Sequence, residues 1–197
     1  MKDETMIVQE ILGKRIELRT DLGLFSPGHV DRGTLAMLSR ADFMPGMQVM
    51  DLGCGCGVVG IIAALICGAQ NVVMSDIDPV AVRTARENAA RNGVGEITCI
   101  LSDGFARVDR TGFDLILSNP PYQSDFSVAK AFIEKGFNRL KPGGRMLMVT
   151  KRRTWYRNKL STVFGGVKIY DIDGYYVFEA QKRTMHYARG QKSRPKT

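Results

Sequence analysis

The chain has 197 residues, of which 44% are hydrophobic, and it carries a net charge of +8. A chain of this length can bury roughly 70% of the surface that its unfolded form exposes, so the composition indicates one folded domain with its own core. Its longest apolar stretch, residues 58–67, is far shorter than the roughly 20 residues that a membrane helix needs, and no secretory segment is evident, so we expect a cytoplasmic protein.

The N-terminal part predicts a hairpin, with strands at 7–11 and 15–19, and then a helix at 31–40. Strands are next expected at 48–52, 72–76, 97–101, 113–118, 145–150, 167–171 and 175–180, with helices at 58–67, 79–92 and 127–140 and a turn at 141–144. This alternation is typical of an α/β fold with a doubly wound, mostly parallel sheet of seven strands. We expect one domain over residues 1–181, with the hairpin and first helix in 1–45, the catalytic core in 46–181, and a flexible basic tail in 182–197.

Residues 51–57, Asp-Leu-Gly-Cys-Gly-Cys-Gly, join a predicted strand to a predicted helix. They overlap the dinucleotide pattern G-x-G-x-x-G, which is a weak signal by itself. Asp51 would repel the pyrophosphate of a nicotinamide cofactor but attract the cationic amino-acid group of S-adenosylmethionine (SAM). We therefore predict a SAM site with contacts from Asp51, Gly53, Gly55 and Gly57.

Acidic residues also end the next two predicted strands, where sheets of this kind bind ligands. Asp76 lies 19 residues after the last loop glycine, where an acid accepts hydrogen bonds from ribose hydroxyls. Asp78 precedes a proline and is better placed to cap a helix, while Ile77 is assigned to the cofactor site. Asp103 is expected to accept from an adenine amino group, with Phe105 beside the ring. The alternative for Asp103 is a plain turn residue.

The sequence Asn-Pro-Pro-Tyr at 119–122 follows the fourth strand of the predicted sheet. An amino group on a ring or an amide is a poor nucleophile because its lone pair is delocalised. The side-chain oxygen of Asn119 and the carbonyl of Pro120 can accept its two N–H bonds and hold it for methyl transfer. Pro121 is assigned to the substrate and Asn119 also to the cofactor, and Tyr122 is expected to stack on the target base. The alternative is that the prolines only end the strand and Tyr122 packs nearby.

Four segments in this order, residues 20–27, 31–34, 51–57 and 118–122, resemble the class I SAM-dependent methyltransferases and, among them, the methyltransferase small-domain family. That family contains the ribosomal small-subunit guanine-N2 methyltransferases. The resemblance implies a Rossmann-like fold, SAM as the cofactor, and an exocyclic amine of rRNA as the target, with guanine N2 favoured. It also implies that Phe25, Ser26, Pro27 and Thr34 close over the cofactor, with Phe25 counted among the substrate contacts. Related enzymes with this tetrapeptide modify adenine N6 in DNA or RNA, or a protein glutamine amide, and both alternatives stay open.

Positive charge is concentrated in the C-terminal part of the chain. Residues 141–197 contain 14 Lys and Arg against 3 Asp and Glu, whereas residues 1–140 have a net charge of −3. Lys151, Arg152 and Arg153 lie close to Trp155, and cations interleaved with aromatics suit phosphate pairing and base stacking. We therefore expect nucleic acid, either rRNA or a ribosomal particle, as the partner. Trp155 also fits a core position, and the basic tail also fits a solvated terminus.

No spacing of cysteine and histidine fits a metal site. We expect the cysteines to be reduced thiols and the protein to need no metal. Two other function classes remain: a methyltransferase for a small amine, and a non-catalytic RNA-binding module. The basic C-terminal part argues against the first and Asn119 against the second, and the oligomeric state stays open.

Overall fold

The computed structural model describes residues 4–21, 29–121 and 126–187. The strands are β1 (Glu4–Ile11), β2 (Lys14–Asp21), β3 (Val49–Leu52), β4 (Val72–Asp76), β5 (Thr98–Leu101), β6 (Phe113–Ser118), β7 (Leu140–Thr150), β8 (Lys168–Ile172) and β9 (Tyr175–Gln181). The helices are α1 (Arg32–Leu38), α2 (Val58–Cys67), α3 (Pro79–Arg91), α4 (Phe126–Arg139) and α5 (Arg153–Phe164), with a short 3-10 turn η1 (Ala69–Asn71) before β4.

The main sheet has seven strands in the order β5-β4-β3-β6-β7-β9-β8, and β1 and β2 form a separate hairpin. The strands β5, β4, β3, β6 and β7 are parallel to one another, whereas β9 is antiparallel to both β7 and β8. This topology confirms the predicted doubly wound, mostly parallel sheet and its N-terminal hairpin. Among the described residues, no helix is both long and apolar enough to cross a membrane.

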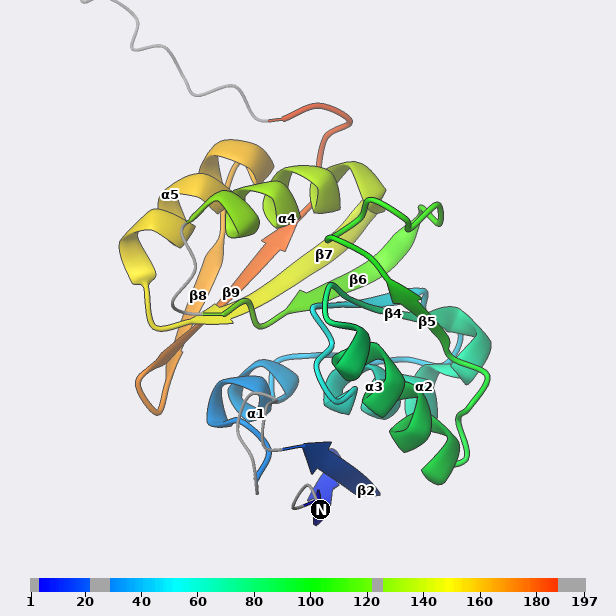
Figure 1. Cartoon of the computed structure of the whole chain (residues 1–197). Helices are drawn as coiled ribbons and strands as arrows, with labels where there is room; N and C mark the ends of the chain where they lie inside the picture. The colour runs from blue at the N-terminus through cyan, green and yellow to red at the C-terminus, as the bar shows by residue number, and fades with distance from the viewer. Residues whose placement is uncertain (1–3, 22–28, 122–125, 188–197) are drawn as a thin grey trace, which may run out of the picture.

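Helices cover both faces of the main sheet (Figure 1). The helices α4 and α5 lie on one face, and α1, α2, α3 and the hairpin lie on the other. Each face has its own hydrophobic cluster, one centred on residues such as Ile62 and Leu115 and the other on residues such as Phe137 and Ile116. Because consecutive side chains of a strand point to opposite faces, β6 supplies both clusters.

Two parts of the fold differ from the sequence prediction. No helix was predicted where α5 lies, although Tyr156, Leu160, Val163 and Phe164 form its buried stripe at helical spacing. The cations Lys151, Arg152 and Arg153 at its start, with Arg157 and Lys159 further along, obscure the apolar period in the sequence. The turn predicted at 141–144 lies inside β7, where the register against β6 jumps from Leu140 to Arg145 and so accommodates the extra residues as a bulge.

The chain continues along α4 after β9. Lys182 is 5% exposed, its ammonium group donates to the carbonyl of Leu140 at 2.8 Å, and desolvation lowers its pKa. The hydroxyl of Tyr187 donates to the carbonyl of Glu134 at 2.8 Å, and its ring packs edge-on against Phe137. Lys182 and Tyr187 therefore contact the fold, although residues 183–187 are exposed, and the domain boundary after residue 181 stays a prediction.

Candidate cofactor and acceptor site

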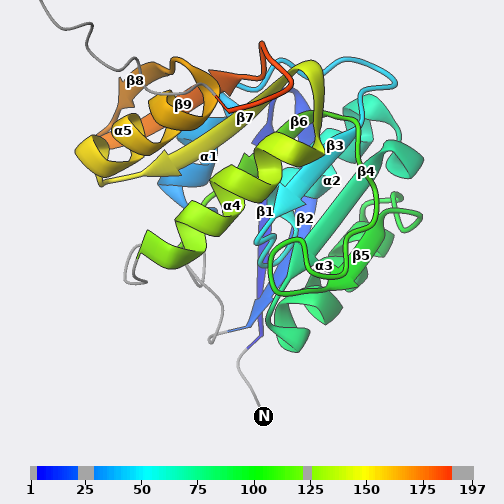
Figure 2. The ribbon, with the colours of Figure 1, turned by 90° about the horizontal axis from the view of Figure 1, so that it is seen from above.

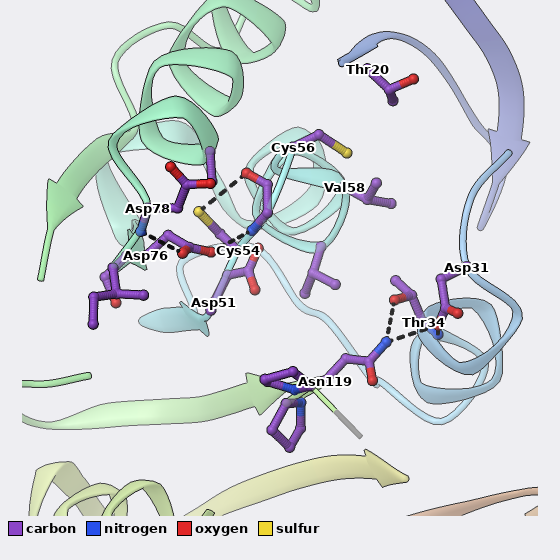
Figure 3. Close-up of a pocket in the computed structure, with 18 of the residues that line it drawn as sticks. Thr20, Asp31, Thr34, Asp51, Cys54, Cys56, Val58, Asp76, Asp78 and Asn119 are labelled. Atoms are coloured by element: carbon purple, nitrogen blue, oxygen red, sulfur yellow. Dashed lines mark hydrogen bonds between the residues drawn. The ribbon is translucent and has the colours of Figure 1, made fainter. Parts of the chain in front are cut away.

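A cavity of about 380 Å³ opens at the carboxyl ends of the central strands. Its wall combines the hairpin, the start of α1, the glycine loop after β3, the ends of β4 and β5, and the residues after β6 (Figure 3). The sequence-predicted site residues in this wall are Thr34, Asp51, Gly53, Gly55, Asp76, Ile77, Asp103, Asn119, Pro120 and Pro121. The glycine loop and the Asn-Pro-Pro segment therefore meet in one cavity.

The glycine loop is fixed between β4 and α3. The N–H groups of Gly53 and Cys54 donate to the carbonyl of Ser75, at 2.9 and 3.0 Å. Gly57 has a φ of +91°, and a side chain there would begin 3.2 Å from the Cβ of Ala85 on α3. Only glycine combines this backbone conformation with so close an approach. Gly57 thus packs against α3 and is not among the residues that line the cavity.

The carboxylate of Asp76 is anchored at the end of β4 by two backbone groups. Its Oδ2 accepts the N–H of Gly55 at 2.9 Å, and its Oδ1 accepts the N–H of Asp78 at 3.0 Å (Figure 3). Asp78 in turn caps α3 by accepting the N–H of Val80 at 2.8 Å. Each oxygen of Asp76 has a further lone pair that can accept from a hydroxyl in the cavity.

Asp51 lies beside the glycine loop and is 3% exposed. Its Oδ2 accepts the N–H of Gly60 at 2.9 Å. Burial raises the pKa of Asp51 to about 7, the hydrogen bond from Gly60 opposes this rise, and the charge of Asp76 adds to it. A cationic group that enters the cavity would stabilise the ionised form of this acid.

The cavity wall near β5 combines apolar side chains with an acid. Ile77 is 67% exposed despite its large apolar side chain, and it lines the cavity together with Asp103. Phe105, predicted beside the same ring, is 2% exposed and packs in the core. Phe132 of α4 lines the cavity instead, 3.1 Å from the point where a side chain on Gly104 would begin. Sequence reasoning missed Phe132 because a phenylalanine in an amphipathic helix is typical of a core position.

The first turn of α1 holds the side chain of Asn119 (Figure 3). The amide nitrogen donates to Oδ2 of Asp31 at 2.8 Å and to the hydroxyl of Thr34 at 3.0 Å. The same Asp31 oxygen accepts the backbone N–H of Thr34 and so caps α1. Because the amide nitrogen is engaged with α1, the carboxamide oxygen of Asn119 is turned away from that helix.

The two prolines after Asn119 differ in exposure. Pro120 is buried and Pro121 is exposed, and both line the cavity. The hydroxyl of Ser118 donates to the carbonyl of Leu52 at 2.8 Å, which fixes the end of β6 beside the end of β3. The predicted contacts Tyr122 and Phe25 lie outside the described residues, as do Ser26 and Pro27.

The three cations predicted to bind nucleic acid lie between β7 and the start of α5. Lys151 lies 4.9 Å from the ring centroid of Tyr175, Arg152 lies 5.0 Å from that of Phe126, and Arg153 lies 5.6 Å from that of Tyr176. All three cations are exposed, and none of them lines the cavity. They follow a parallel strand beside β6, so they share the sheet edge from which Asn119 extends.

Trp155 connects the starts of α4 and α5. Its ring stacks on Phe126 with 4.3 Å between centroids and 15° between planes, and its edge contact with Tyr156 is 5.2 Å. Trp155 is half-buried, whereas Tyr156 is buried. The tryptophan therefore packs against the core with one part of its ring and has an exposed part beside the row of cations.

The cysteines have no arrangement that suggests a metal. Within the ranges that the structure describes, no three His, Cys, Asp or Glu side chains are grouped to hold a metal ion. Cys54, Cys56, Cys67 and Cys99 are free thiols. Burial raises the pKa of Cys54 well above its ordinary value and that of Cys56 to about 11, so both thiols of the glycine loop are protonated at neutral pH.

Comparison with solved structures agrees with this geometry. The chain is similar to a Thermus thermophilus 16S rRNA N2-guanine methyltransferase (RsmC) in complex with AdoMet and guanosine, with a TM-score of 0.82 and 27% identity over 91% of this chain and 51% of that one. It is also similar to TrmN from Thermus thermophilus, with a TM-score of 0.65 and 28% identity over 76% of this chain and 48% of that one.

Curated relatives give the same picture. The chain is 34% identical to ribosomal RNA small subunit methyltransferase C of Hahella chejuensis, over 78% of this chain and 46% of that protein. It is 32% identical to the protein of the same name from Pseudomonas putida strain F1, over 81% of this chain and 49% of the relative. The chain thus spans about half the length of these relatives. The sequence pattern of the family described as methyltransferase small domain matches residues 15–179, and the chain belongs to that family.

Proposed function

We propose that this protein is a SAM-dependent methyltransferase that modifies an exocyclic amino group of a base in RNA, with guanine N2 of rRNA as the favoured target. One observation carries the proposal: Asn119 is held by α1 at the same cavity into which Asp51 and Asp76 face. The names of the relatives support it, because the curated relatives and RsmC are named as rRNA methyltransferases. The structure of RsmC is also a complex with AdoMet and guanosine.

The cavity fits the chemistry of SAM at two places. Asp76, anchored by backbone N–H groups, would accept hydrogen bonds from the ribose hydroxyls, and Ile77 would offer an apolar surface to a flat ring next to Asp103. Asp51 supplies the negative charge for a cationic amino-acid group. When bound, SAM supplies a methyl group on a sulfonium that is already activated as a leaving group.

The acceptor side of the cavity needs only two oxygen atoms. The side-chain oxygen of Asn119 and the carbonyl of Pro120 would accept the two N–H bonds of the amine and direct its lone pair into the cavity. The contacts with Asp31 and Thr34 set the orientation of the Asn119 amide before the substrate arrives. The amine loses its proton after it has become cationic, so no side-chain base is required.

The proposed RNA surface lies at the same sheet edge as the cavity. Lys151, Arg152 and Arg153 would pair with phosphates, and Trp155 with Phe126 offers an aromatic surface for a base next to the target. Placing the target base in the cavity would require it to leave its stack, at a cost of a few kcal/mol that new stacking contacts offset. A small amine would gain nothing from this row of cations.

The test combines binding with product analysis. Calorimetry should detect SAM binding to the purified protein, and incubation with SAM and small-subunit rRNA should yield N2-methylguanosine on mass analysis of nucleosides. An Asn119→Ala protein should bind SAM and form no product. Appearance of N6-methyladenosine alone would overturn the guanine assignment. Tight NADH binding without SAM binding would overturn the cofactor.

A further inference from the structure

The outer edge of β2 is hydrogen-bonded to two asparagine side chains of α3. Asn92 accepts the N–H of Glu17 at 2.9 Å and donates to its carbonyl at 2.7 Å. Asn88 accepts the N–H of Arg19 at 2.8 Å and donates to its carbonyl at 2.9 Å. Each carboxamide therefore exchanges both bonds with one strand residue, as a residue of a neighbouring antiparallel strand would do.

The spacing explains why a helix can replace a strand here. Asn88 and Asn92 are four residues apart on one face of α3, which corresponds to about 6 Å along the helix axis. Glu17 and Arg19 are two residues apart in β2, which corresponds to about 6.8 Å along a strand. The two repeats match closely enough for both pairs to form at once. The hairpin is thereby extended by side chains of α3, which we call the asparagine ladder.

The two asparagines differ in their remaining contact. Asn88 is 0% exposed, and its nitrogen also donates to the carbonyl of Cys56 in the glycine loop at 2.9 Å. The nitrogen of Asn92 instead donates to the carbonyl of Asn88 in its own helix, at 2.8 Å. Ala85, one turn before Asn88, is the residue against which Gly57 packs. Of the two asparagines, Asn88 is thus the one that connects the hairpin to the loop.

The ladder brackets a side chain of the cavity wall. Leu18 lies between Glu17 and Arg19, is paired with Ile7 across the hairpin, and lines the cavity together with Ile7 and Thr20. The position of this wall therefore depends on the ladder. Figure 2 shows the hairpin seen from above, with β1 and β2 running beside the helices of this face.

We propose that Asn88 is a positioning residue that couples the hairpin wall of the cavity to the conformation of the glycine loop. A ligand that orders the loop would then strengthen the docking of β2. Loosening of β2 would lower the affinity for that ligand by the same factor, because coupling between sites is reciprocal. The identity of the ligand as SAM rests on the proposed function. The coupling itself does not rest on the proposed function, because the contacts of Asn88 with Arg19 and with Cys56 exist in the protein without a ligand.

Hydrogen exchange of Asn88→Ala and Asn92→Ala, compared with the parent protein, separates coupling from simple stabilisation. Both variants lose one rung of the ladder, and Asn92→Ala is the matched control because it leaves the contact with Cys56 intact. Without ligand, exchange of the Glu17 amide should accelerate at least tenfold in Asn92→Ala, with the Gly57 amide unchanged. In Asn88→Ala, the amides of Arg19 and Gly57 should both accelerate. Unchanged exchange at Gly57 in Asn88→Ala would overturn the proposal.

The second measurement adds SAM. Protection of Arg19 should rise in the parent protein and in Asn92→Ala, whereas in Asn88→Ala this response should fall at least fivefold although the loop still binds SAM. An equal response in both variants would show that the ladder only stabilises the hairpin. If Asn88→Ala does not fold, Asn88→Asp keeps the acceptor for the N–H of Arg19 and removes the donor to the carbonyls of both Arg19 and Cys56. The Gly57 amide then gives the same decision. Absence of SAM binding in the parent protein would overturn the cofactor assignment and leave the ligand-free result to decide the coupling.

Discussion

The side-chain nitrogen of Asn119 lies 2.8 Å from Oδ2 of Asp31, the same carboxylate oxygen that caps α1. One acid therefore both starts a helix and orients the amide proposed to hold the acceptor. A charged acceptor makes each of these hydrogen bonds stronger than a neutral one would. The orientation of Asn119 is thus a property of the folded protein before any substrate binds.

This relationship predicts a selective loss in the Asp31→Ala variant. Without its carboxylate partner, the Asn119 amide can rotate, and a misplacement of about 1 Å costs on the order of 100-fold in rate. We expect kcat to fall about 10- to 100-fold, while SAM affinity measured by calorimetry changes less than threefold. Asp42→Ala is the control, since Asp42 is an exposed acid paired with Arg145. Equal kcat in Asp31→Ala and the control would contradict the orienting role.

Asp51 predicts a pH dependence of SAM binding. Its pKa is about 7 in the ligand-free protein, and a cationic ligand favours the ionised form, so binding below this pH must release a proton. Affinity should fall as the pH drops below 7, approaching tenfold per pH unit, and should level off above 8. Calorimetry across this range gives the slope, and Asp51→Asn should bind more weakly without this dependence. A flat profile in the parent protein would remove Asp51 as the partner of the cation.

The same group affects the stability of the ligand-free protein. The ordinary pKa of an Asp, 3.8, applies to the unfolded chain, and burial raises it to about 7 in the folded one. Between these values the folded state binds more protons, so this group's contribution to stability decreases as the pH rises from 4 to 7 and is constant above that. Denaturant titrations at a series of pH values give the free energy of unfolding. Its change with pH should differ between the parent protein and Asp51→Asn within this window only.

Gly60 of α2 predicts a packing defect. A Cβ on Gly60 would lie 2.3 Å from the sulfur and 2.4 Å from Cγ of Met74, which is fully buried under the helix. Gly60→Ala should therefore lower the free energy of unfolding by about 1–3 kcal/mol, the usual cost of overpacking. Gly166→Ala is the control, because open space surrounds that position, and it should stay within about 0.5 kcal/mol. Denaturant unfolding measures both.

The proposed RNA surface predicts a change in salt dependence. Log affinity for RNA should fall linearly with log salt, and every phosphate interaction that Lys151→Gln or Arg153→Gln removes should reduce the slope by about 0.7–0.9. Arg91→Gln, at the end of α3 far along the chain from these cations, is the matched control. SAM affinity should stay unchanged in all three. Slopes equal to that of the parent protein would exclude these cations from the interface.

The tail is tested by a truncation that respects the fold. Removal of residues after Gln181 would also delete Lys182 and Tyr187, which pack on α4, so the cleaner truncation ends at Tyr187. If the remaining basic residues bind RNA, this truncation should weaken RNA binding, flatten its salt dependence and leave SAM affinity intact. Identical RNA affinity and slope in both proteins would identify the tail as an inert terminus.

The sequence was sufficient for the sheet and for the motifs at its edge. Residues 58–67, 72–76 and 113–118 coincide with α2, β4 and β6, since continuous apolar runs bounded by Gly, Asp or Asn leave few alternatives. Asp78 was also recognised as a helix cap. These features depend on local patterns, which are visible without knowing what each segment contacts.

The side-chain contacts that build the candidate site and dock the hairpin could not be predicted, because they join segments that are distant in the sequence. Asp31 and Asn119 are 88 residues apart, and Asn88 and Arg19 are 69 apart, so no local pattern relates them. Phe105 was predicted beside Asp103 for the same reason, because no local pattern shows that its side chain packs in the core while Phe132 of α4 lines the cavity. Asparagine inside a predicted helix is a local signal that could have pointed to the ladder, because asparagine is a poor helix former.

The two hydrophobic clusters divide the molecule by chemistry as well as by space. The hairpin, α2 and α3, which surround the glycine loop, pack in one cluster, while α4 and α5, which carry the proposed RNA contacts, pack in the other. Substitutions on α5 can therefore alter which nucleic acid is recognised while the packing beneath the cofactor loop is retained. The sheet thus separates the packing beneath the cofactor loop from the packing beneath the proposed RNA contacts, although Phe132 of α4 reaches the cavity wall.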